Sequence, residues 1–350
     1  MSAIPRLTSL SHGGGCGCKI APGVLQDILS RSGVPFPLPK QLLVGIETSD
    51  DAAVYQINET QAIVATTDFF MPVVDDPFHF GQIAATNAIS DVYAMGGTPL
   101  FALALVGMPV NTLPTETIRK ILEGGESVCA AAGIPVAGGH TIDSVEPIYG
   151  LVAIGLVDPR QLKKNSGGQS GDVLVLGKPL GVGIYSAALK KEKLAAADYD
   201  AMIASTTKLN TAGIDLGALD GVHALTDVTG FGLLGHLLEI ARGSKMAAEV
   251  DFKALPLLDN ALRYAQQGLI TGASGRNWAA YGKDVVFDTS LGEVERALLT
   301  DPQTSGGLLV SCSPAAETTV LEIFRRHGFD RASRIGRLVD GIAQVRVSRT

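Results

Sequence analysis

The sequence predicts a mixed α/β fold, and three observations support this fold class. A length of 350 residues is typical of a chain with about two domains. Hydrophobic residues make up 46% of the chain and charged residues only 18%, as expected for large folded cores rather than disorder. Short β-branched runs alternate with helical segments in both halves, so each half is expected to form an α/β or α+β layered domain.

In the N-terminal half, short apolar runs predict strands and longer segments predict helices. The expected strands are 42–45, 52–55, 62–67, 100–106, 136–137 and 148–156, and the expected helices are 22–29, 80–95 and 114–132. Gly96 and Gly97 stop the second of these helices, and Pro99 lies just beyond them. Gly138 to Thr141 are expected to form a tight turn after the strand at 136–137.

The composition changes between Asp158 and Asp172, where a polar, glycine-rich connection predicts a domain boundary. Beyond it we expect strands at 174–176 and 308–310, a helix after 181–183, and a helix over 233–242 that ends at Gly243. Residues 275–278 are expected to lie in a loop. We therefore divide the chain into a glycine-rich arm and lead-in (1–45), an N-terminal domain (46–157) and a C-terminal domain (158–350).

Charge and cysteine content argue against several classes of protein. With a net charge of −7, the chain lacks the general excess of positive charge that is typical of nucleic-acid-binding proteins. Four cysteines (Cys16, Cys18, Cys129 and Cys312) do not make a disulfide framework in a chain of this length. The N-terminus lacks the apolar core of a signal peptide, and stretches such as 100–110 are shorter than the roughly 18 residues that span a bilayer. We expect a soluble, cytoplasmic protein with no nucleic-acid or membrane partner.

The segment from Ser11 to Lys19 contains two thiols, four glycines and one ammonium group. Glycine lets the backbone adopt positive φ and approach a ligand closely, and a lysine near a cysteine favours the thiolate. These features predict a mobile arm that carries a reactive sulfur, Cys16, and a cation, Lys19. Two other interpretations stay open: a disordered N-terminus, and a disulfide or metal pair of Cys16 with Cys18, for which no further Cys/His cluster completes four ligands.

The predicted helix over 80–95 carries an unusual polar face. Thr86, Asn87, Ser90 and Asp91 share this face, which contains no Lys, Arg or Glu. A solvated helix face normally carries such long charged side chains, so short polar ones favour a lined cavity. A surface or structural role for Asp91 stays open at this point.

Asp91 is one of four aspartates that could share a metal ion. Asp51 precedes a predicted strand, Asp68 ends one, and Asp227 precedes the turn 230–232. If these carboxylates converge, they repel one another unless a divalent ion neutralises them, and Mg²⁺ prefers such oxygen ligands. The chain contains neither a Walker A motif nor the protein-kinase motifs, so nucleotide chemistry would need another scaffold.

Seven motifs together carry a resemblance to a known family. They are Ser-His-Gly-Gly-Gly-Cys-Gly-Cys-Lys (11–19), Asp-Asp-Ala-Ala-Val (50–54), Thr-Thr-Asp-Phe-Phe (66–70), Asn-Ala-Ile-Ser-Asp (87–91), Ala-Gly-Gly-His (137–140), Thr-Asp-Val-Thr-Gly-Phe-Gly-Leu-Leu-Gly-His (226–236) and Asp-Pro-Gln-Thr-Ser-Gly-Gly (301–307). In this order they resemble the selenophosphate synthetase (selenide, water dikinase) family. Its wider superfamily includes aminoimidazole ribonucleotide synthetase, thiamine-monophosphate kinase and a hydrogenase maturation factor, which share the frame and the aspartates but not the Cys-Gly-Cys-Lys arm.

The resemblance implies a two-domain aminoimidazole ribonucleotide synthetase-like fold. In that fold the strands of the N-terminal domain pair across a homodimer to form a β-barrel, and a C-terminal α/β sandwich follows. The implied reaction is ATP + selenide + water → selenophosphate + phosphate + AMP, with Mg²⁺ required and K⁺ as an activator. A selenium-delivery protein and downstream selenium-transfer enzymes are the implied further partners.

The resemblance also implies roles for particular residues. Cys16 and Lys19 occupy the catalytic positions, and Asp51, Asp91 and Asp227 occupy the metal-binding positions. The implied nucleotide-binding set is Lys19, Thr48, Ser49, Asp50, Asp68, Asp91, Gly139, His140 and Thr141. Ser49 stands where some relatives carry arginine, and Cys18 is given a secondary role.

Two other functions compete with this one. The first is a superfamily ATPase that acts on another acceptor, such as an aminoimidazole precursor or thiamine phosphate; such reactions do not require a thiol arm. The second is a thiol-based metal or redox carrier that uses Cys16 and Cys18, which would leave the aspartates and the Gly139-His140 motif unexplained.

Overall fold

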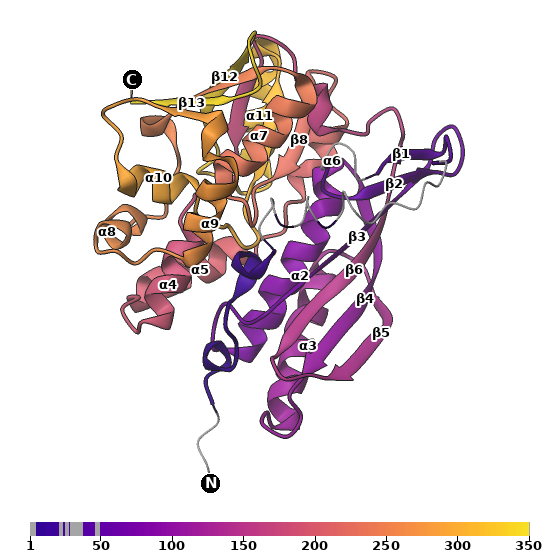
Figure 1. The fold of residues 1–350 in the computed structure, drawn as a ribbon. Helices are drawn as coiled ribbons and strands as arrows, with labels where there is room; N and C mark the ends of the chain where they lie inside the picture. The colour runs from indigo at the N-terminus through magenta and orange to yellow at the C-terminus, as the bar shows by residue number, and fades with distance from the viewer. Residues whose placement is uncertain (1–4, 21–23, 25–27, 29–37, 46–49, 350) are drawn as a thin grey trace.

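The structure, a computed structural model, describes residues 5–20, 24, 28, 38–45 and 50–349 (Figure 1). Two mixed β-sheets, each accompanied by helices, form its two parts, which confirms the predicted α/β class. The N-terminal sheet has the strand order β1-β2-β3-β6-β4-β5, and the C-terminal sheet has the order β10-β13-β9-β12-β7-β11-β8. No helix among the described residues is long and apolar enough to span a membrane.

The N-terminal part contains these elements in chain order: the 3₁₀ turns η1 (Leu7–Leu10) and η2 (Gly15–Cys18), β1 (Leu42–Val44), β2 (Ala53–Gln56), β3 (Ala62–Phe70), α2 (Pro77–Ala94), β4 (Thr98–Met108), α3 (Thr115–Ala131), β5 (Val136–Asp143) and β6 (Ile148–Val157). The C-terminal part contains β7 (Val173–Leu176), α4 (Val182–Lys190), α5 (Ala196–Thr206), α6 (Ala212–Gly217), β8 (Val222–Asp227), α7 (Gly232–Ser244), β9 (Ala247–Asp251), α8 (Ala261–Gln266), α9 (Gly272–Tyr281), β10 (Val285–Phe287), α10 (Glu293–Leu299), β11 (Leu308–Cys312), α11 (Glu317–Arg326), β12 (Ser333–Val339) and β13 (Val345–Ser348).

Helix α2 lies at the centre of the molecule, between the N-terminal sheet and the C-terminal part (Figure 1). Asp76 caps its N-terminus by accepting the backbone N–H of His79 at 2.8 Å, and Pro77 begins it. The other part approaches it closely, because a Cβ at Gly213 of α6 would lie 2.2 Å from the carbonyl oxygen of Tyr93. The polar face of α2 therefore lies inside the molecule rather than in solvent.

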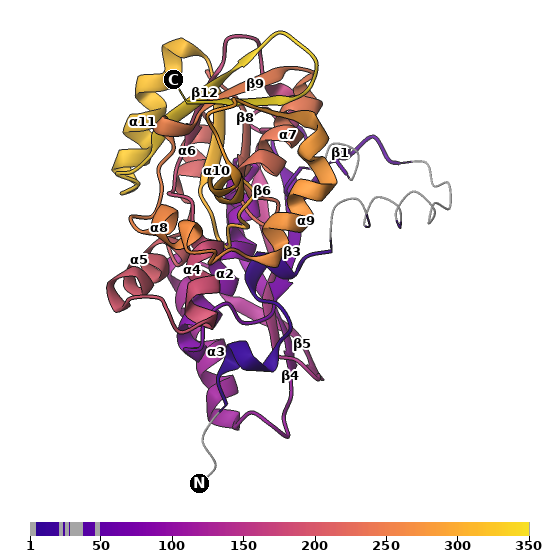
Figure 2. The ribbon, with the colours of Figure 1, turned by 60° about the vertical axis from the view of Figure 1, so that its left-hand side comes forward.

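The C-terminal sheet is covered on both faces. Along β7, Val173 and Val175 pack in one cluster with α6 and α11, whereas Leu174 and Leu176 pack on the opposite side with α7. A strand buried on both faces carries consecutive apolar residues rather than an alternation, as this one does. The C-terminal part lies at the top and the N-terminal part at the bottom of the molecule in Figure 2.

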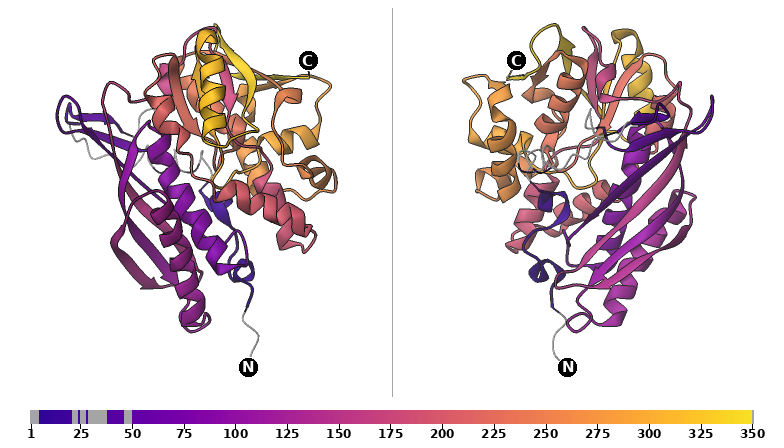
Figure 3. Two further views of the ribbon diagram at one scale, coloured as in Figure 1. Left: turned by 180° about the vertical axis from the view of Figure 1, so that it is seen from behind. Right: turned by 45° about the vertical axis from the view of Figure 1, so that its right-hand side comes forward.

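The N-terminal sheet differs, because α2 and α3 cover only one of its faces. The other face carries no helix in the described part of the chain, as the right panel of Figure 3 shows. Apolar side chains lie on the exposed surface of this part, including Tyr55 of β2 and Phe69 of β3, which are 45% and 50% exposed. Ile142 of the edge strand β5 is also exposed.

Four local predictions were wrong, and for the two in the N-terminal sheet a tertiary contact outweighs the local signal. Asp68 does not end its strand: β3 continues to Phe70 because β6 pairs with it throughout. Gly138 to Thr141 form no turn but lie within β5, where Gly139 pairs with Ala104 of β4. A Cβ at Gly139 would lie 2.0 Å from the Ala104 carbonyl oxygen, so the glycine serves this close approach.

The other two differences concern helices. Helix α7 continues through Gly243 to Ser244 and ends at Lys245, which adopts the left-handed conformation. Residues 275–278 lie in α9 rather than in a loop, because Thr271 caps this helix by accepting the N–H of Ser274. The helix predicted at 22–29 lies largely outside the described residues. The division of the chain at 45/46 and 157/158 stays a prediction.

Candidate active site

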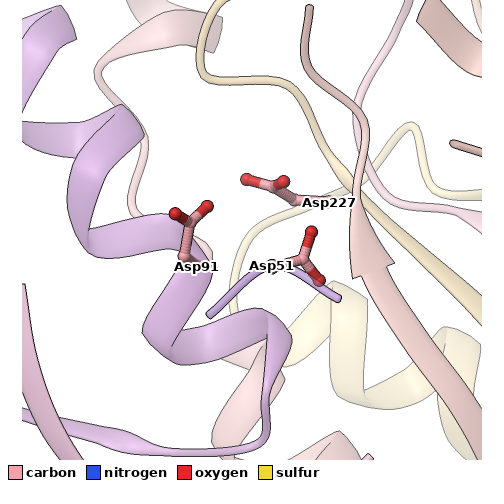
Figure 4. Close-up of side chains that lie close together, drawn as sticks. All are labelled: Asp51, Asp91 and Asp227. Carbon is pink, nitrogen blue, oxygen red and sulfur yellow. The ribbon is translucent and has the colours of Figure 1, made fainter. Parts of the chain in front are cut away.

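Three aspartates that are distant in the sequence converge between the two parts of the molecule. Asp51 lies just before β2, Asp91 on α2 and Asp227 at the end of β8. One carboxylate oxygen of each lies within 4.8 Å of the others, and Figure 4 shows the three side chains around one space. The convergence that the sequence could not establish is therefore present for these three.

Hydroxyl groups on neighbouring elements orient these carboxylates. Thr66 of β3 donates to Asp91 at 2.5 Å, and Thr226 of β8 donates to Asp51 at 2.8 Å. Ser90, one residue before Asp91 on α2, donates to Asp227. The polar face of α2 thus provides both an acid and the donor that fixes another acid, which explains why its side chains are short.

Burial and mutual repulsion set the electrostatics of this cluster. Burial is the main cause that raises the pKa of Asp51 and of Asp91 well above the usual aspartate value, and the charge of Asp227 adds to it. Burial also raises the pKa of Asp227, although the Ser90 hydrogen bond opposes that rise. Three acids held this close favour binding of a cation, which would remove the repulsion.

The donor set fits Mg²⁺. All three groups are carboxylates, which hard divalent cations prefer. The second oxygen of Asp51, Oδ2, is buried and has no hydrogen-bond partner among the described residues. A buried acceptor without a donor is costly, and a bound cation would satisfy it.

The aspartates line a cavity of about 690 Å³, which we call the acidic cavity. Asp50 and Glu239 line it too, together with one lysine, Lys19 of the arm. The volume lies in the usual range for a small-molecule or cofactor site. The cavity can therefore hold a ligand of nucleotide size next to the aspartates.

The arm is folded against the rest of the protein, and Cys16 is fully buried. The backbone N–H of Cys16 donates to Thr304 Oγ1 at 3.1 Å, and its thiol donates to Asn87 Oδ1 at 3.2 Å. Gly15 adopts a φ of +54°, and a Cβ there would lie 2.2 Å from Thr304 Oγ1. This glycine is thus required for the contact and not merely for mobility.

Asn87 connects the thiol to the cation of the arm. Its amide oxygen accepts the N–H of Ser305 at 2.7 Å as well as the Cys16 thiol, and its NH₂ group donates to Asp68 at 2.5 Å. Asp68 in turn accepts from Lys19 Nζ at 3.1 Å. The two predicted catalytic residues are therefore linked by one hydrogen-bonded chain through Asn87 and Asp68.

The expectation that Lys19 makes Cys16 a thiolate is wrong for this folded arm. Burial raises the pKa of Cys16 well above the usual thiol value, and the nearby charge of Lys19 lowers it only in part. Lys19 pairs with Asp68 instead; burial opposes its charge, but Asp68, Cys16 and Asp91 together raise its pKa. In this conformation Cys16 is a thiol, as its hydrogen bond to the Asn87 oxygen requires.

The remaining predicted positions are only partly brought together. Asp50 lines the acidic cavity and accepts the N–H of Asn165 at 2.6 Å. Thr48 and Ser49 lie outside the described residues. Gly139, His140 and Thr141 lie on the edge strand β5 and do not line the acidic cavity. Cys18 is partly buried next to the arm contacts.

The sequence analysis missed the residues that hold the site together. Thr304 and Ser305 belong to the motif 301–307, which contributes to the family resemblance but to whose residues the sequence analysis assigns no role. Lys178 is buried and donates to the Ser305 carbonyl oxygen at 2.9 Å, and Asn210 donates to Ser90 at 2.8 Å. The three consecutive polar residues 303–305, flanked by Pro302 and two glycines, were the available signal.

Comparisons with known proteins are consistent with this geometry. Residues 49–157 match the family profile "AIR synthase related protein, N-terminal domain", and residues 169–347 match "AIR synthase related protein, C-terminal domain". The chain is 69% identical over 336 residues to a selenide, water dikinase of Dechloromonas aromatica, covering 96% of each chain. It is 67% identical over 346 residues to that of Paraburkholderia xenovorans, covering 99% of this chain and 98% of the relative.

Solved structures share the fold at low sequence identity. Thiamine-monophosphate kinase from Stenotrophomonas maltophilia superposes with a TM-score of 0.66 at 22% identity, covering 95% of this chain and 96% of the other. A thiamine-monophosphate kinase structure described as AaThiL complexed with AMPPCP and TMP gives a TM-score of 0.62 at 19% identity, covering 94% and 93%. These likenesses establish the two-part fold.

Proposed function

The chain belongs to the family of selenide, water dikinases, which are phosphotransferases, and we propose that it converts ATP, selenide and water to selenophosphate, phosphate and AMP. The match to relatives that are named selenide, water dikinase extends over almost their full length, which supports the activity: 98% of the Paraburkholderia relative is covered. The single structural observation that carries the proposal is the convergence of Asp51, Asp91 and Asp227 beside a buried thiol and a lysine.

The acidic cavity is the proposed nucleotide site. Asp51, Asp91 and Asp227 would hold Mg²⁺, which when bound offsets the charge of the phosphates. Asp50 and Lys19 line the same cavity, and Thr48 and Ser49 are proposed to join them. Phosphoryl transfer depends mainly on positioning and charge neutralisation, which this set of residues can supply.

Lys19 and Cys16 are the proposed catalytic residues. Lys19 Nζ lies 3.1 Å from Asp68 and keeps its charge there, so it is placed to stabilise a transferring phosphoryl group. Cys16 is proposed to handle selenium by guiding selenide to the phosphoryl group, with no bond between its sulfur and selenium. Its thiol is held by Asn87 and excluded from water in the folded arm.

We propose a homodimer in which the strands of the two N-terminal sheets pair across the interface to form a β-barrel, with their uncovered faces turned toward each other. Exposed Tyr55 and Phe69 support this, because a face with such apolar side chains favours association. Gly139, His140 and Thr141 lie on the edge strand of that sheet, outside the acidic cavity of their own chain. In a dimer, these residues would reach a nucleotide through the contact with the second copy of the chain.

Several finer features of the proposal come from the family resemblance. K⁺ is the proposed activator, the cytoplasm the proposed compartment, and a selenium-delivery protein and selenium-transfer enzymes the proposed partners. The division into arm (1–45), nucleotide-binding and dimerisation domain (46–157) and C-terminal domain (158–350) is part of the same proposal.

Phosphorus NMR tests the activity directly. Protein, ATP, Mg²⁺ and ⁷⁷Se-enriched selenide are mixed without oxygen, and a phosphorus resonance split by selenium is expected together with AMP. ATP turnover that needs another acceptor, with no split resonance, would indicate a different ATPase of the superfamily. Bound zinc with no ATP turnover would indicate the thiol-based carrier.

A further inference from the structure

A second large cavity lies on another side of the arm. Its volume is about 310 Å³, and its walls are the arm, the loop after β3, helix α4 and the first turn of α9. Lys190, Lys191 and Arg276 line it, and no aspartate or glutamate does among the described residues. We call it the basic cavity. It stands out in a chain whose net charge is −7.

The buried thiol lies between the basic and the acidic cavity. Within the described part of the chain these two cavities share no lining residue, but a small space of about 10 Å³ adjoins both and is lined by Cys16. This small space shares Gly17, Ala273 and Arg276 with the basic cavity, and Lys19, Gly230 and Phe231 with the acidic cavity. Its volume is at the lower limit for one water, so the folded arm closes the connection to anything larger.

Arg276 stands at the junction between the basic cavity and the thiol. Its guanidinium donates to the carbonyl oxygen of Gly17 at 2.8 Å, next to Cys16 in the chain. The guanidinium is otherwise exposed, so it can bind an anion in the cavity and hold the arm at the same time. A shift of the arm at Gly17 would widen the small space and join the basic cavity to the sulfur.

The two cavities differ in which ligands they favour. Hydrogen selenide is a stronger acid than a thiol and is an anion at neutral pH. Among the described residues, the acidic cavity has four aspartates and Glu239 against Lys19, so these groups repel a free anion unless cations are bound. The basic cavity attracts one, and its volume of about 310 Å³ is enough for a hydrated anion.

We propose that the basic cavity is the access and binding site for the anionic selenium substrate, with Arg276 as the residue that positions it for Cys16. This inference rests on the proposed function and adds the route of the second substrate. Nucleotide and selenium then reach Cys16 and Lys19 from opposite sides of the arm. The two anions do not compete for one opening.

Steady-state kinetics test the route in the active enzyme. Arg276→Gln and Lys191→Gln are each expected to raise the KM for selenide about three- to tenfold, because one charge close to the anion is removed. The KM for ATP is expected to stay within about twofold. Arg119→Gln removes an exposed charge from α3, far from the cavity, and should change neither constant. A selenide KM that is equal in Arg276→Gln and Arg119→Gln would overturn the inference.

Thiol alkylation tests the same route without any turnover. The rates of Cys16 modification by anionic iodoacetate and neutral iodoacetamide are compared, with Cys16→Ser subtracting the other cysteines. Arg276→Gln should lower the iodoacetate-to-iodoacetamide ratio about three- to tenfold, while Arg119→Gln leaves it unchanged. An unchanged ratio in Arg276→Gln contradicts the inference even if the enzyme makes selenophosphate. A lowered ratio without selenophosphate supports the route and rejects the proposed function.

Discussion

The acidic and the basic cavity lie on two sides of one buried sulfur, yet they are built differently. In the acidic cavity the three convergent aspartates are largely buried, and each accepts a hydrogen bond from a hydroxyl of β3, α2 or β8. In the basic cavity the cations are exposed on α4 and α9, and Arg276 is held by one bond to the arm. A buried, oriented set of charges suits an ion that stays, whereas exposed charges suit an anion that passes through.

This difference also explains which part of the molecule supplies each cavity. The acids come from both parts, so the acidic cavity exists only when the two parts pack together. The basic side chains come from the C-terminal part, and the arm together with the loop after β3 closes that cavity. The acidic cavity therefore depends on how the two parts pack, and the basic cavity depends also on the position of the arm.

The largest effect is expected from the acidic cavity. Asp51→Asn, Asp91→Asn and Asp227→Asn should each lower AMP release at least about 100-fold, because each removes a charge from the proposed metal site. AMP release is measured with selenide and saturating Mg²⁺. Lys193→Gln, a surface change beyond α4, is the control and should keep wild-type activity. Full activity in any one aspartate variant removes that residue from the ligand set.

Removal of the sulfur comes next. Cys16→Ser should lower selenide-dependent AMP release by about 100-fold, because a hard hydroxyl oxygen contacts the soft selenide anion less favourably than a thiol sulfur does. The fold should survive, since the serine hydroxyl can still donate to Asn87 Oδ1, and thermal unfolding checks this. Cys18→Ser is the matched control and should retain most activity. Wild-type turnover in Cys16→Ser would show that the thiol is dispensable.

A smaller effect is expected from the contact that holds the arm. Thr304→Val keeps the shape of the side chain but removes the acceptor for the Cys16 N–H. The lost hydrogen bond should destabilise the folded arm by about 1 kcal/mol, which raises the population of the open arm about fivefold. Iodoacetamide should then modify Cys16 about fivefold faster. Thr304→Ser retains the acceptor and should react like the wild type. Equal rates in Thr304→Val and Thr304→Ser would mean that the hydroxyl does not hold the arm.

The smallest effect concerns a buried acid behind the basic cavity. Asp301 accepts the N–H of Ile184 at the start of α4, and burial raises its pKa to about 8. The folded protein therefore holds a proton that the unfolded chain releases near pH 4, so stability falls as pH rises from about 4 to 8.

For one group this slope is at most about 1.4 kcal/mol per pH unit, or about 2–4 °C in Tm. The Tm of Asp301→Asn should fall less than that of the wild type between pH 6 and 8. Parallel curves for the two proteins would contradict the raised pKa.

Much of the fold could be predicted from local patterns. Apolar runs such as 62–67 and the helix stop at Gly96 mark elements that the structure confirms as β3 and α2. The errors lie where a contact with a residue distant in the sequence determines the local structure. Gly139 needs its positive φ to approach β4, and Gly243 lets α7 lie close to the backbone of Asn165. Neither contact leaves a mark within a short window of sequence.

The residue types of the site could be predicted from the sequence, but the protonation state of Cys16 could not. The short polar face of α2 indicated a cavity, and Asn87 and Ser90 on this face donate to Asp68 and Asp227. The protonation of Cys16 could not be inferred, because Lys19 beside it in sequence pairs with Asp68 in space. Burial of the thiol depends on Thr304 and Asn87, which come from distant parts of the chain.

Anomalous diffraction from crystals grown with Mn²⁺ and then soaked in selenate tests the opposite character of the two cavities most directly. The manganese edge is expected to give a peak among Asp51, Asp91 and Asp227, and the selenium edge a peak near Arg276 and Lys191. Manganese absent from the three aspartates, or selenium found in the acidic cavity and not in the basic one, would contradict the account.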